Sequence, residues 1–160
     1  MKETYSFSYD VLDDSSQLSK EDAALLQAAR EATGVAYAPY SRFFVGAAAL
    51  LANGEMIKGT NQENASYPVG ICAERVLLGT AATLYPDVPV VAMAVSFNTA
   101  AEKSNHPISP CGMCRQSLLE YETRFHQPIR LIMAGMEGKV QVVESARQLL
   151  PFAFTSQELI

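Results

Sequence analysis

Apolar residues recur with the period of a helix early in the chain and then form a continuous run. Ser19-Lys-Glu-Asp22 predicts a capped helix start, and Gly34 predicts the end of that helix. The apolar run Val45–Leu51 predicts a buried strand, followed by a tight turn at Asn53-Gly54 and a returning strand over residues 55–61. This part of the chain is therefore expected to form one helix and one antiparallel hairpin.

The middle of the chain continues the alternation of helical and strand patterns. A second helix is predicted between Cys72 and Pro86, and an apolar strand over Pro89–Phe97. A polar loop follows at residues 98–107. Ser109-Pro110 then predicts the start of a third helix, with the serine as its N-cap and the proline as its first helical residue.

The C-terminal third completes an α/β pattern. Two strands are predicted at Pro128–Ala134 and Lys139–Val143, and a short helix at Ser145–Leu150. Strands that alternate with helices predict a three-layer α/β domain, and the antiparallel hairpin requires the sheet to be mixed. We expect one domain over residues 19–160. Residues 1–18 are expected to form a short strand or an arm, followed by a linker.

Composition and charge exclude several classes of function. The net charge is 12 − 17 = −5 and there is no basic stripe, which disfavours nucleic-acid binding. No apolar run is long enough to cross a bilayer, and the N-terminus lacks a signal-peptide core. Three cysteines, an odd number, argue against a disulfide framework. We therefore expect a reduced, cytoplasmic protein without a membrane partner.

All three cysteines lie in two short segments, Cys72-Ala-Glu-Arg75 and Pro110-Cys-Gly-Met-Cys114. Three thiolates can fill three corners of a tetrahedral zinc site, and an open fourth corner is typical of a catalytic site. The two histidines, His106 and His126, lack a ligand-like spacing and are predicted to be surface or loop residues. The alternative is that the cysteines are buried apolar thiols. We expect one zinc ion per chain, held by Cys72, Cys111 and Cys114.

Glu74 lies two residues after Cys72, within reach of water at the open corner of such a site. A carboxylate there can serve as a general acid/base, which contributes typically about 10²–10⁴-fold to a rate. The alternative is a surface carboxylate that stabilises the helix dipole. Three thiolates leave zinc with a formal charge of −1. We expect the two helix N-termini, Arg75 and Arg115 to offset that charge.

Three motifs in a fixed order resemble the small, three-cysteine cytidine deaminases. They are Asn61-Gln-Glu-Asn-Ala-Ser-Tyr67, Cys72-Ala-Glu-Arg75 and Ser109-Pro-Cys-Gly-Met-Cys-Arg-Gln116. The resemblance extends over residues 37–154. It implies a three-layer α/β/α sandwich with a mixed five-stranded sheet, and a zinc-dependent hydrolysis of cytidine and deoxycytidine in pyrimidine salvage. It also implies a homotetramer, with a dimer as the alternative.

The resemblance further assigns roles to residues outside the cysteine segments. Asn61 and Glu63 match the pair that binds the ribose hydroxyls, with strand-end capping as the alternative. Phe43, in a Pro-Tyr-Ser-x-Phe segment, matches an aromatic that flanks the base. Ala73 matches a position whose backbone N–H meets the base carbonyl, and Arg75 matches the residue that balances charge near zinc.

The C-terminal aromatic residues belong to the same comparison. Phe154 matches an aromatic that reaches a neighbouring subunit's site, although Phe152 is an alternative because the local Pro-Phe-Ala-Phe sequence differs from the family's. If Phe154 has this role, the active site requires an oligomer.

Three other functions compete with cytidine deamination. Another free-nucleoside deaminase of this fold, similar to the blasticidin deaminases, would share the zinc site; Asn61 and Glu63 favour a ribose instead. A non-catalytic scaffold stabilised by zinc is disfavoured by Glu74 and by the missing fourth ligand. A deaminase that edits nucleic acids is disfavoured by the acidic charge.

Overall fold

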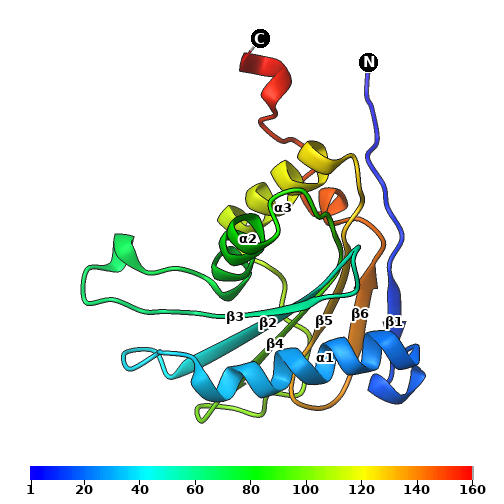
Figure 1. Ribbon diagram of the computed structural model, residues 1–160. Coiled ribbons are helices and arrows are strands. Elements are labelled where there is room, and N and C mark those ends of the chain that lie inside the picture. The colour runs from blue at the N-terminus through cyan, green and yellow to red at the C-terminus, as the bar shows by residue number, and fades with distance from the viewer. Residues whose placement is uncertain (160) are drawn as a thin grey trace.

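The computed structural model describes residues 1–159, which form a three-layer α/β/α sandwich (Figure 1). One mixed sheet has the strand order β1-β6-β5-β4-β2-β3, in which only β4 and β5 are parallel neighbours. The strands are β1 (Asp10–Leu12), β2 (Phe43–Leu51), β3 (Met56–Thr60), β4 (Val90–Thr99), β5 (Arg130–Ala134) and β6 (Val140–Val143).

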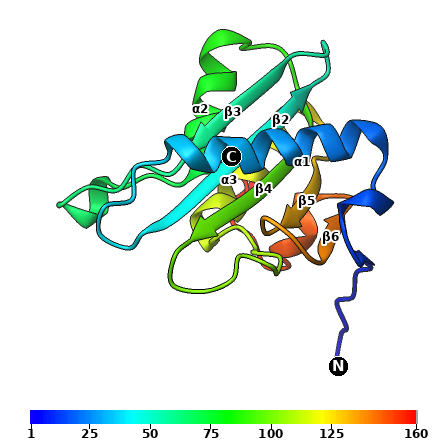
Figure 2. The same ribbon diagram turned by 90° about the horizontal axis from the view of Figure 1, so that it is seen from below.

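Helices cover both faces of this sheet. α1 (Lys20–Ala32) crosses one face, and α2 (Ala73–Leu84) and α3 (Gly112–Phe125) lie on the other (Figure 2). Two apolar cores result: one between the sheet and α1, and a larger one between the sheet and the α2–α3 pair. The predicted architecture is confirmed, and the cysteine-bearing helices share one layer.

The predicted strand number was wrong: the sheet has six strands rather than five. The additional strand, β1, lies within residues 1–18 and pairs antiparallel with β6, from Asp10 opposite Val142 to Leu12 opposite Val140. β1 has only three residues, and Asp10 and Val11 are exposed. It joins the sheet through backbone pairing at an edge, so it leaves almost no buried apolar pattern in the sequence.

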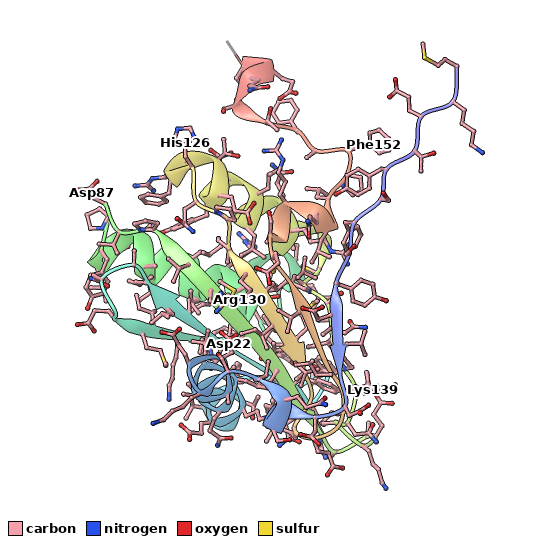
Figure 3. The ribbon with its side chains drawn as sticks, turned by 90° about the vertical axis from the view of Figure 1, so that its right-hand side faces the viewer. Asp22, Asp87, His126, Arg130, Lys139 and Phe152 are labelled. Atoms are coloured by element: carbon pink, nitrogen blue, oxygen red, sulfur yellow. The ribbon has the colours of Figure 1, made fainter. Side chains whose placement is uncertain are left out.

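The first helix begins as predicted. The Ser19 hydroxyl accepts a hydrogen bond from the Asp22 N–H at 3.1 Å, which confirms the N-cap. The Asp22 carboxylate forms a salt bridge with Arg130 of β5 at 2.5 Å, and the two side chains face each other in Figure 3. α1 ends at Ala32, and Gly34 lies in the 3₁₀ turn that follows.

Two glycines let the helices approach the sheet closely. A Cβ at Gly46 of β2 would overlap the backbone carbonyl of Ala29 in α1. A Cβ at Gly59 of β3 would overlap the carbonyl of Ala73, the first residue of α2. The absent side chain at Gly59 therefore sets how near the sheet the start of α2 can lie.

A buried carboxylate fixes the segment that leads to the C-terminal tail. Glu122 of α3 is 7% exposed. It accepts hydrogen bonds from the N–H groups of Ile129, Ala146 and Arg147 at 2.8, 2.9 and 3.3 Å, and from the Ser145 hydroxyl. Because a buried carboxylate needs such donors, this network holds the 3₁₀ helix Ala146–Leu149 against α3.

The helices of the described residues are short relative to a bilayer. None of them combines the length and the apolar character that a membrane span requires.

Candidate active site

The starts of α2 and α3 bring the two cysteine segments together. Cys72 is the N-cap of α2, and Cys111 is the N-cap of α3. The prediction that Ser109 caps the third helix was wrong, because the helix begins at Gly112, two residues later than Pro110. Two thiols therefore occupy the cap positions themselves, beside backbone N–H groups that favour negative charge.

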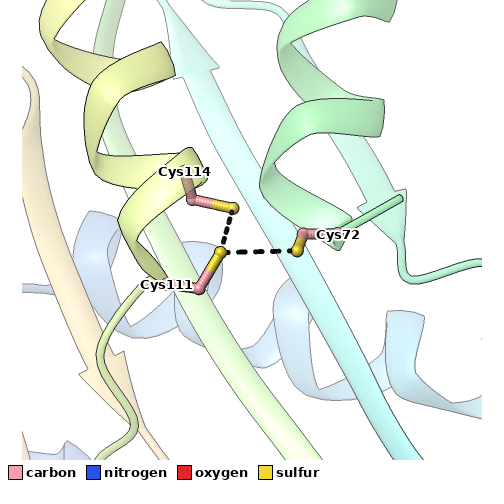
Figure 4. Close-up of side chains that lie close together, drawn as sticks. All are labelled: Cys72, Cys111 and Cys114. Atoms are coloured by element: carbon pink, nitrogen blue, oxygen red, sulfur yellow. Dashed lines mark hydrogen bonds between the residues drawn. The ribbon is translucent and has the colours of Figure 1, made fainter. Parts of the chain in front are cut away.

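The three sulfur atoms form a compact cluster (Figure 4). The Sγ atoms of Cys72 and Cys111 are 3.6 Å apart, as are those of Cys111 and Cys114. Zinc–sulfur bonds of about 2.3 Å in a tetrahedral site place sulfurs about 3.8 Å apart. The cluster thus has the dimensions of a zinc site, and none of the three cysteines is in a disulfide.

The cluster has three ligands among the described residues. No fourth histidine, cysteine, aspartate or glutamate ligand atom joins it there. His106 lies in the loop after β4, and His126 is the C-cap of α3, at the opposite end from Cys111. Three ligands leave one tetrahedral corner for water, as a catalytic site requires.

The three thiols differ in how readily they lose a proton. The neighbouring Cys114 thiol lowers the pKa of Cys72 to about 6, against the effect of burial, which raises it. Cys111 and the positive charge of Arg75 lower it further by smaller amounts. The neighbouring Cys72 thiol, together with burial, raises the pKa of Cys114. Cys72 therefore loses its proton readily, whereas Cys114 keeps its proton. Full deprotonation of all three needs a cation among them, as bound Zn²⁺ would provide.

Glu74 lies in the first turn of α2 and is 4% exposed. Burial raises the pKa of its carboxyl group from the ordinary value, although its own backbone N–H and Cys114 act in the opposite direction. A surface carboxylate that stabilises a helix dipole would be solvated. The burial of Glu74 therefore fits a group that exchanges protons near the cluster.

A cavity of about 450 Å³ opens beside the cluster, within the range usual for small-molecule sites. It brings together most of the predicted site residues. Those that line it are Phe43, Asn61, Glu63, Cys72, Ala73, Glu74 and Cys111.

Glu63 is held by the turn that precedes β2. Its carboxylate accepts hydrogen bonds from the N–H groups of Tyr40 and Ser41, at 2.9 and 3.2 Å, and from the Ser41 hydroxyl. The Ser41 hydroxyl contributes most to lowering the pKa of Glu63. Ser41 in turn accepts a hydrogen bond from the Phe43 N–H at 3.0 Å. The carboxylate is thus ionised and oriented at the cavity.

Asn61 extends the ladder between β2 and β3 with its side chain. Its amide oxygen accepts the Val45 N–H at 2.7 Å, and its amide nitrogen donates to the Phe43 carbonyl at 2.9 Å. An amide oxygen has a second lone pair and an amide nitrogen a second hydrogen. Strand-end capping therefore occupies half of the hydrogen-bonding capacity of Asn61 and leaves the other half for a ligand.

The arginines beside the ligands behave differently from each other. Arg75 lowers the pKa of Cys72 by its positive charge. Arg115 instead donates to the carbonyls of Pro110 and Leu149, at 2.9 and 3.1 Å. Arg115 therefore anchors the segment before Cys111, and Arg75 is the arginine whose charge acts on the thiols.

The C-terminal aromatics lie outside this cavity. Phe154 is 59% exposed and Phe152 is 95% exposed, and neither lines the cavity of its own chain. Phe152 lies on a tail that leaves the body of the protein (Figure 3). The tail is attached to α3 by a hydrogen bond of 2.8 Å from Gln116 to the Phe154 carbonyl.

Sequence reasoning missed several residues of the site. Ser41 orients Glu63, and Ile108 and Ser109 line the cavity. Their positions were the available signal: Ser41 lies two residues before Phe43, and Ile108 and Ser109 directly precede Pro110 and Cys111. Nothing in the residue types alone distinguishes them from ordinary loop residues.

The chain is similar to known proteins in both sequence and fold. The sequence profile of the cytidine and deoxycytidylate deaminase zinc-binding region matches residues 19–126. The crystal structure of a cytidine deaminase from Burkholderia pseudomallei superimposes with a TM-score of 0.71 at 41% identity, over 86% of this chain and 100% of that one.

Two curated relatives extend the comparison. A cytidine deaminase of Halalkalibacterium halodurans is 39% identical over 84% of this chain and 95% of its own length. A blasticidin-S deaminase of Bacillus cereus is 29% identical over 86% of this chain and 95% of its own length. Since the family profile spans more than half of the chain and a near-complete relative is 39% identical, the chain belongs to the cytidine deaminase family.

Proposed function

We propose that the protein hydrolyses the exocyclic amine of cytidine and deoxycytidine, yielding uridine or deoxyuridine and ammonia. The observation that supports this most directly is the juxtaposition of an open three-thiol cluster with the buried carboxylate of Glu74 at one cavity. Asn61 and Glu63 present amide and carboxylate groups at the same cavity. Those groups suit the hydroxyls of a ribose.

Zinc held by Cys72, Cys111 and Cys114 would act as a Lewis acid that makes water nucleophilic near neutral pH. Glu74 then has three tasks in the reaction. It takes a proton from the attacking water, protonates the ring nitrogen beside the attacked carbon, and helps the amine leave as ammonia. The backbone N–H of Ala73 would hold the base carbonyl, and Phe43 would flank the ring.

The direct test is loss of absorbance at the cytosine band when the purified protein meets cytidine. Adenosine, free cytosine and single-stranded DNA serve as parallel substrates, because they separate base specificity, sugar recognition and nucleic-acid editing. We expect turnover of cytidine and deoxycytidine alone. Failure to turn over cytidine and deoxycytidine, by a protein that holds zinc, would contradict the proposal.

A deaminase of blasticidin-S is the second candidate, and the Bacillus cereus relative favours it. The Glu63 carboxylate, held by three donors of the 40–41 turn, favours a ligand with a diol instead. Blasticidin-S added to the same assay decides between the two, since a cytidine deaminase should prefer cytidine in kcat/KM.

Replacing Glu63 with alanine should lower kcat/KM on cytidine by about 10–100-fold, the range expected when a hydrogen bond to a charged group is lost. Zinc content should stay unchanged, because Glu63 belongs to the sugar side of the cavity. Steady-state kinetics and elemental analysis measure the two quantities. Glu55→Ala, at the exposed β2–β3 hairpin, is the control for loss of a surface carboxylate. An unchanged kcat/KM in Glu63→Ala would point to a purely structural role.

We further propose that the protein acts in the cytoplasm, in pyrimidine salvage, as a homotetramer in which the tail of one subunit closes the cavity of another. Phe152 and Phe154 are exposed on the tail and do not line the cavity of their own chain. They support this assembly, since soluble monomers seldom expose such groups without a partner. Residues 19–160 would be the catalytic domain, and residues 1–18 an arm attached through β1.

Phe154→Ala should weaken substrate binding in a way that subunit mixing reverses. The partner for mixing is Glu74→Gln, an inactive chain with an intact tail. Mixed oligomers place an intact tail over an intact zinc site, so KM should return toward the wild-type value in part of the population. Steady-state KM before and after mixing is the measurement.

Light scattering must first establish that both variants assemble and that subunits exchange. If exchange occurs and the mixture retains the KM of Phe154→Ala alone, Phe154 does not act across subunits. Phe152→Ala in the same protocol then tests the alternative residue.

A further inference from the structure

Phe43 is the aromatic wall of the cavity, and its ring does not stand alone. It stacks on Phe97 of β4, with ring centroids 4.9 Å apart and planes at 17°. The two residues are diagonal neighbours on paired strands, because Phe43 lies opposite Thr99 and Val45 lies opposite Phe97. Phe97 is fully buried, so it offers Phe43 a fixed surface on the side away from the ligand.

A third ring extends this stack. The His106 ring lies against Phe97, with centroids 5.0 Å apart and planes at 58°. Both contacts have the separations of favourable aromatic pairs. His106 is exposed, whereas Phe43 is half-buried at the cavity. The stack Phe43–Phe97–His106 thus runs from the cavity wall to the loop that follows β4.

That loop is fastened through Ser104 to two neighbouring segments. Near β4, the Ser104 hydroxyl accepts the Thr99 N–H at 3.1 Å. At the turn between β5 and β6, the Ser104 carbonyl accepts the Met136 N–H at 2.6 Å. The Ser104 side chain is buried. The loop can be followed from the end of β4 in Figure 2.

Two glycines of the β5–β6 turn make this docking possible. A Cβ at Gly135 would overlap the Ser104 carbonyl, and one at Gly138 would overlap the carbonyl of Asn105. Gly138 also has a positive φ of 78°, which side chains rarely adopt. Ser104 and Asn105, the two residues before His106, therefore pack directly against the backbone of these glycines. Ile108 and Ser109, which line the cavity, follow within three residues.

We propose that His106 is a positioning residue, which packs on Phe97 and thereby fixes the Phe43 ring as the base-side wall of the cavity. The loop over residues 100–107 is the element that holds His106 in place. This inference rests on the proposed function, because it assumes that the ligand ring contacts Phe43. Packing of this kind affects substrate binding and leaves the proton transfers at Glu74 unaffected.

The test compares His106→Ala with His106→Phe, which keeps a ring at this position. In His106→Ala, KM for cytidine and Kd for uridine should both rise by about 2–10-fold, the range that loss of one aromatic pair allows. kcat should stay within about 2-fold, as for a loss of uniform binding. His106→Phe should restore both constants. Kinetics give KM and kcat, and titration calorimetry gives Kd for uridine without turnover.

Two controls separate this role from plain packing. His126→Asn removes the other histidine, and asparagine tolerates its left-handed backbone. Thermal melting should place all three histidine variants within a few degrees of the wild type, since both side chains are exposed. Unchanged KM and Kd in His106→Ala, or a His106→Phe variant that fails to restore them, overturns the inference.

The docking of the loop gives a second, independent arm. Gly135→Ala should displace the Ser104 carbonyl and raise the uridine Kd, with zinc content unchanged. Gly34→Ala is the matched control, because a Cβ there meets nothing within 4 Å. A uridine Kd in Gly135→Ala equal to that in Gly34→Ala overturns the role of the loop. A wild-type protein that neither turns over cytidine nor binds uridine overturns the proposed function, and this inference with it.

Discussion

Replacing Glu74 with glutamine is expected to lower kcat on cytidine by at least roughly 10²-fold while zinc content and fold stay intact. Glutamine has nearly the same shape as glutamate, but it neither accepts nor releases a proton at neutral pH. The site of Glu74 is 4% exposed, so solvent has little access to replace the lost proton carrier. The variant should therefore bind substrate and fail at the proton transfers.

Two functions of a carboxylate at this position must be separated. A glutamate in the first turn of a helix stabilises the dipole, an effect of about 0.3–1 kcal/mol on stability with no effect on chemistry. Glu21 has that position in α1 and is exposed, so Glu21→Gln is the matched control. It should leave kcat unchanged. Circular dichroism and elemental analysis verify the fold and the zinc of both variants.

A near-normal kcat in Glu74→Gln would contradict the proposed proton transfers and leave Glu74 only the role of stabilising the helix dipole. A loss of zinc together with kcat would mean that Glu74 stabilises the metal site. The expected pattern, in which kcat falls alone, is specific to a group that moves protons in the reaction.

The elements with strong local signals were predictable from the sequence. Asn53-Gly54 forms the tight turn between β2 and β3, and Ser19 caps α1. The cysteine spacing was sufficient to predict the cluster, because metal ligands are chemically restricted and few in this chain.

Features that depend on contacts between distant segments were not predictable. A short strand within residues 1–18 was one of the expectations, but its pairing with β6 at the edge of the sheet was not, because three residues leave no clear period. The docking of Ser104 on the β5–β6 turn depends on Gly135, thirty-one residues later, and turn glycines are common.

The start of α3 was misplaced because Ser109-Pro110 has the local sequence of a helix N-terminus. The chain remains extended there until Cys111, whose φ and ψ are −67° and 170°.

Loss of one ligand should remove the metal and most of the activity together. Cys111 is the best residue to change, because it is exposed and its truncation leaves the core intact, whereas Cys114 is fully buried. In Cys111→Ala, zinc should fall from about one ion per chain to almost none, since two thiolates seldom form a stable site. Activity should fall with it, because water is no longer activated.

The same substitution predicts a change in stability. Zinc that binds only the folded chain stabilises it by about 4 kcal/mol when free metal exceeds its Kd a thousandfold. For a domain of this size, each kcal/mol of unfolding free energy lost lowers Tm by about 2–4 °C. A chelator should therefore lower the Tm of the wild type by about 8–16 °C. Cys111→Ala should melt near the chelated wild type and show no response to chelator.

Two comparisons decide whether the cluster is a metal site or a group of packed thiols. Packed thiols would give a Tm that is independent of chelator, and Cys111→Ala would then resemble any exposed truncation. Zinc binding predicts that Tm and activity return together when zinc is added back to the chelated wild type, and that neither returns in the variant. A full complement of zinc in Cys111→Ala would require another ligand set. Among the described residues, no other group of three candidate ligands lies close enough to form one.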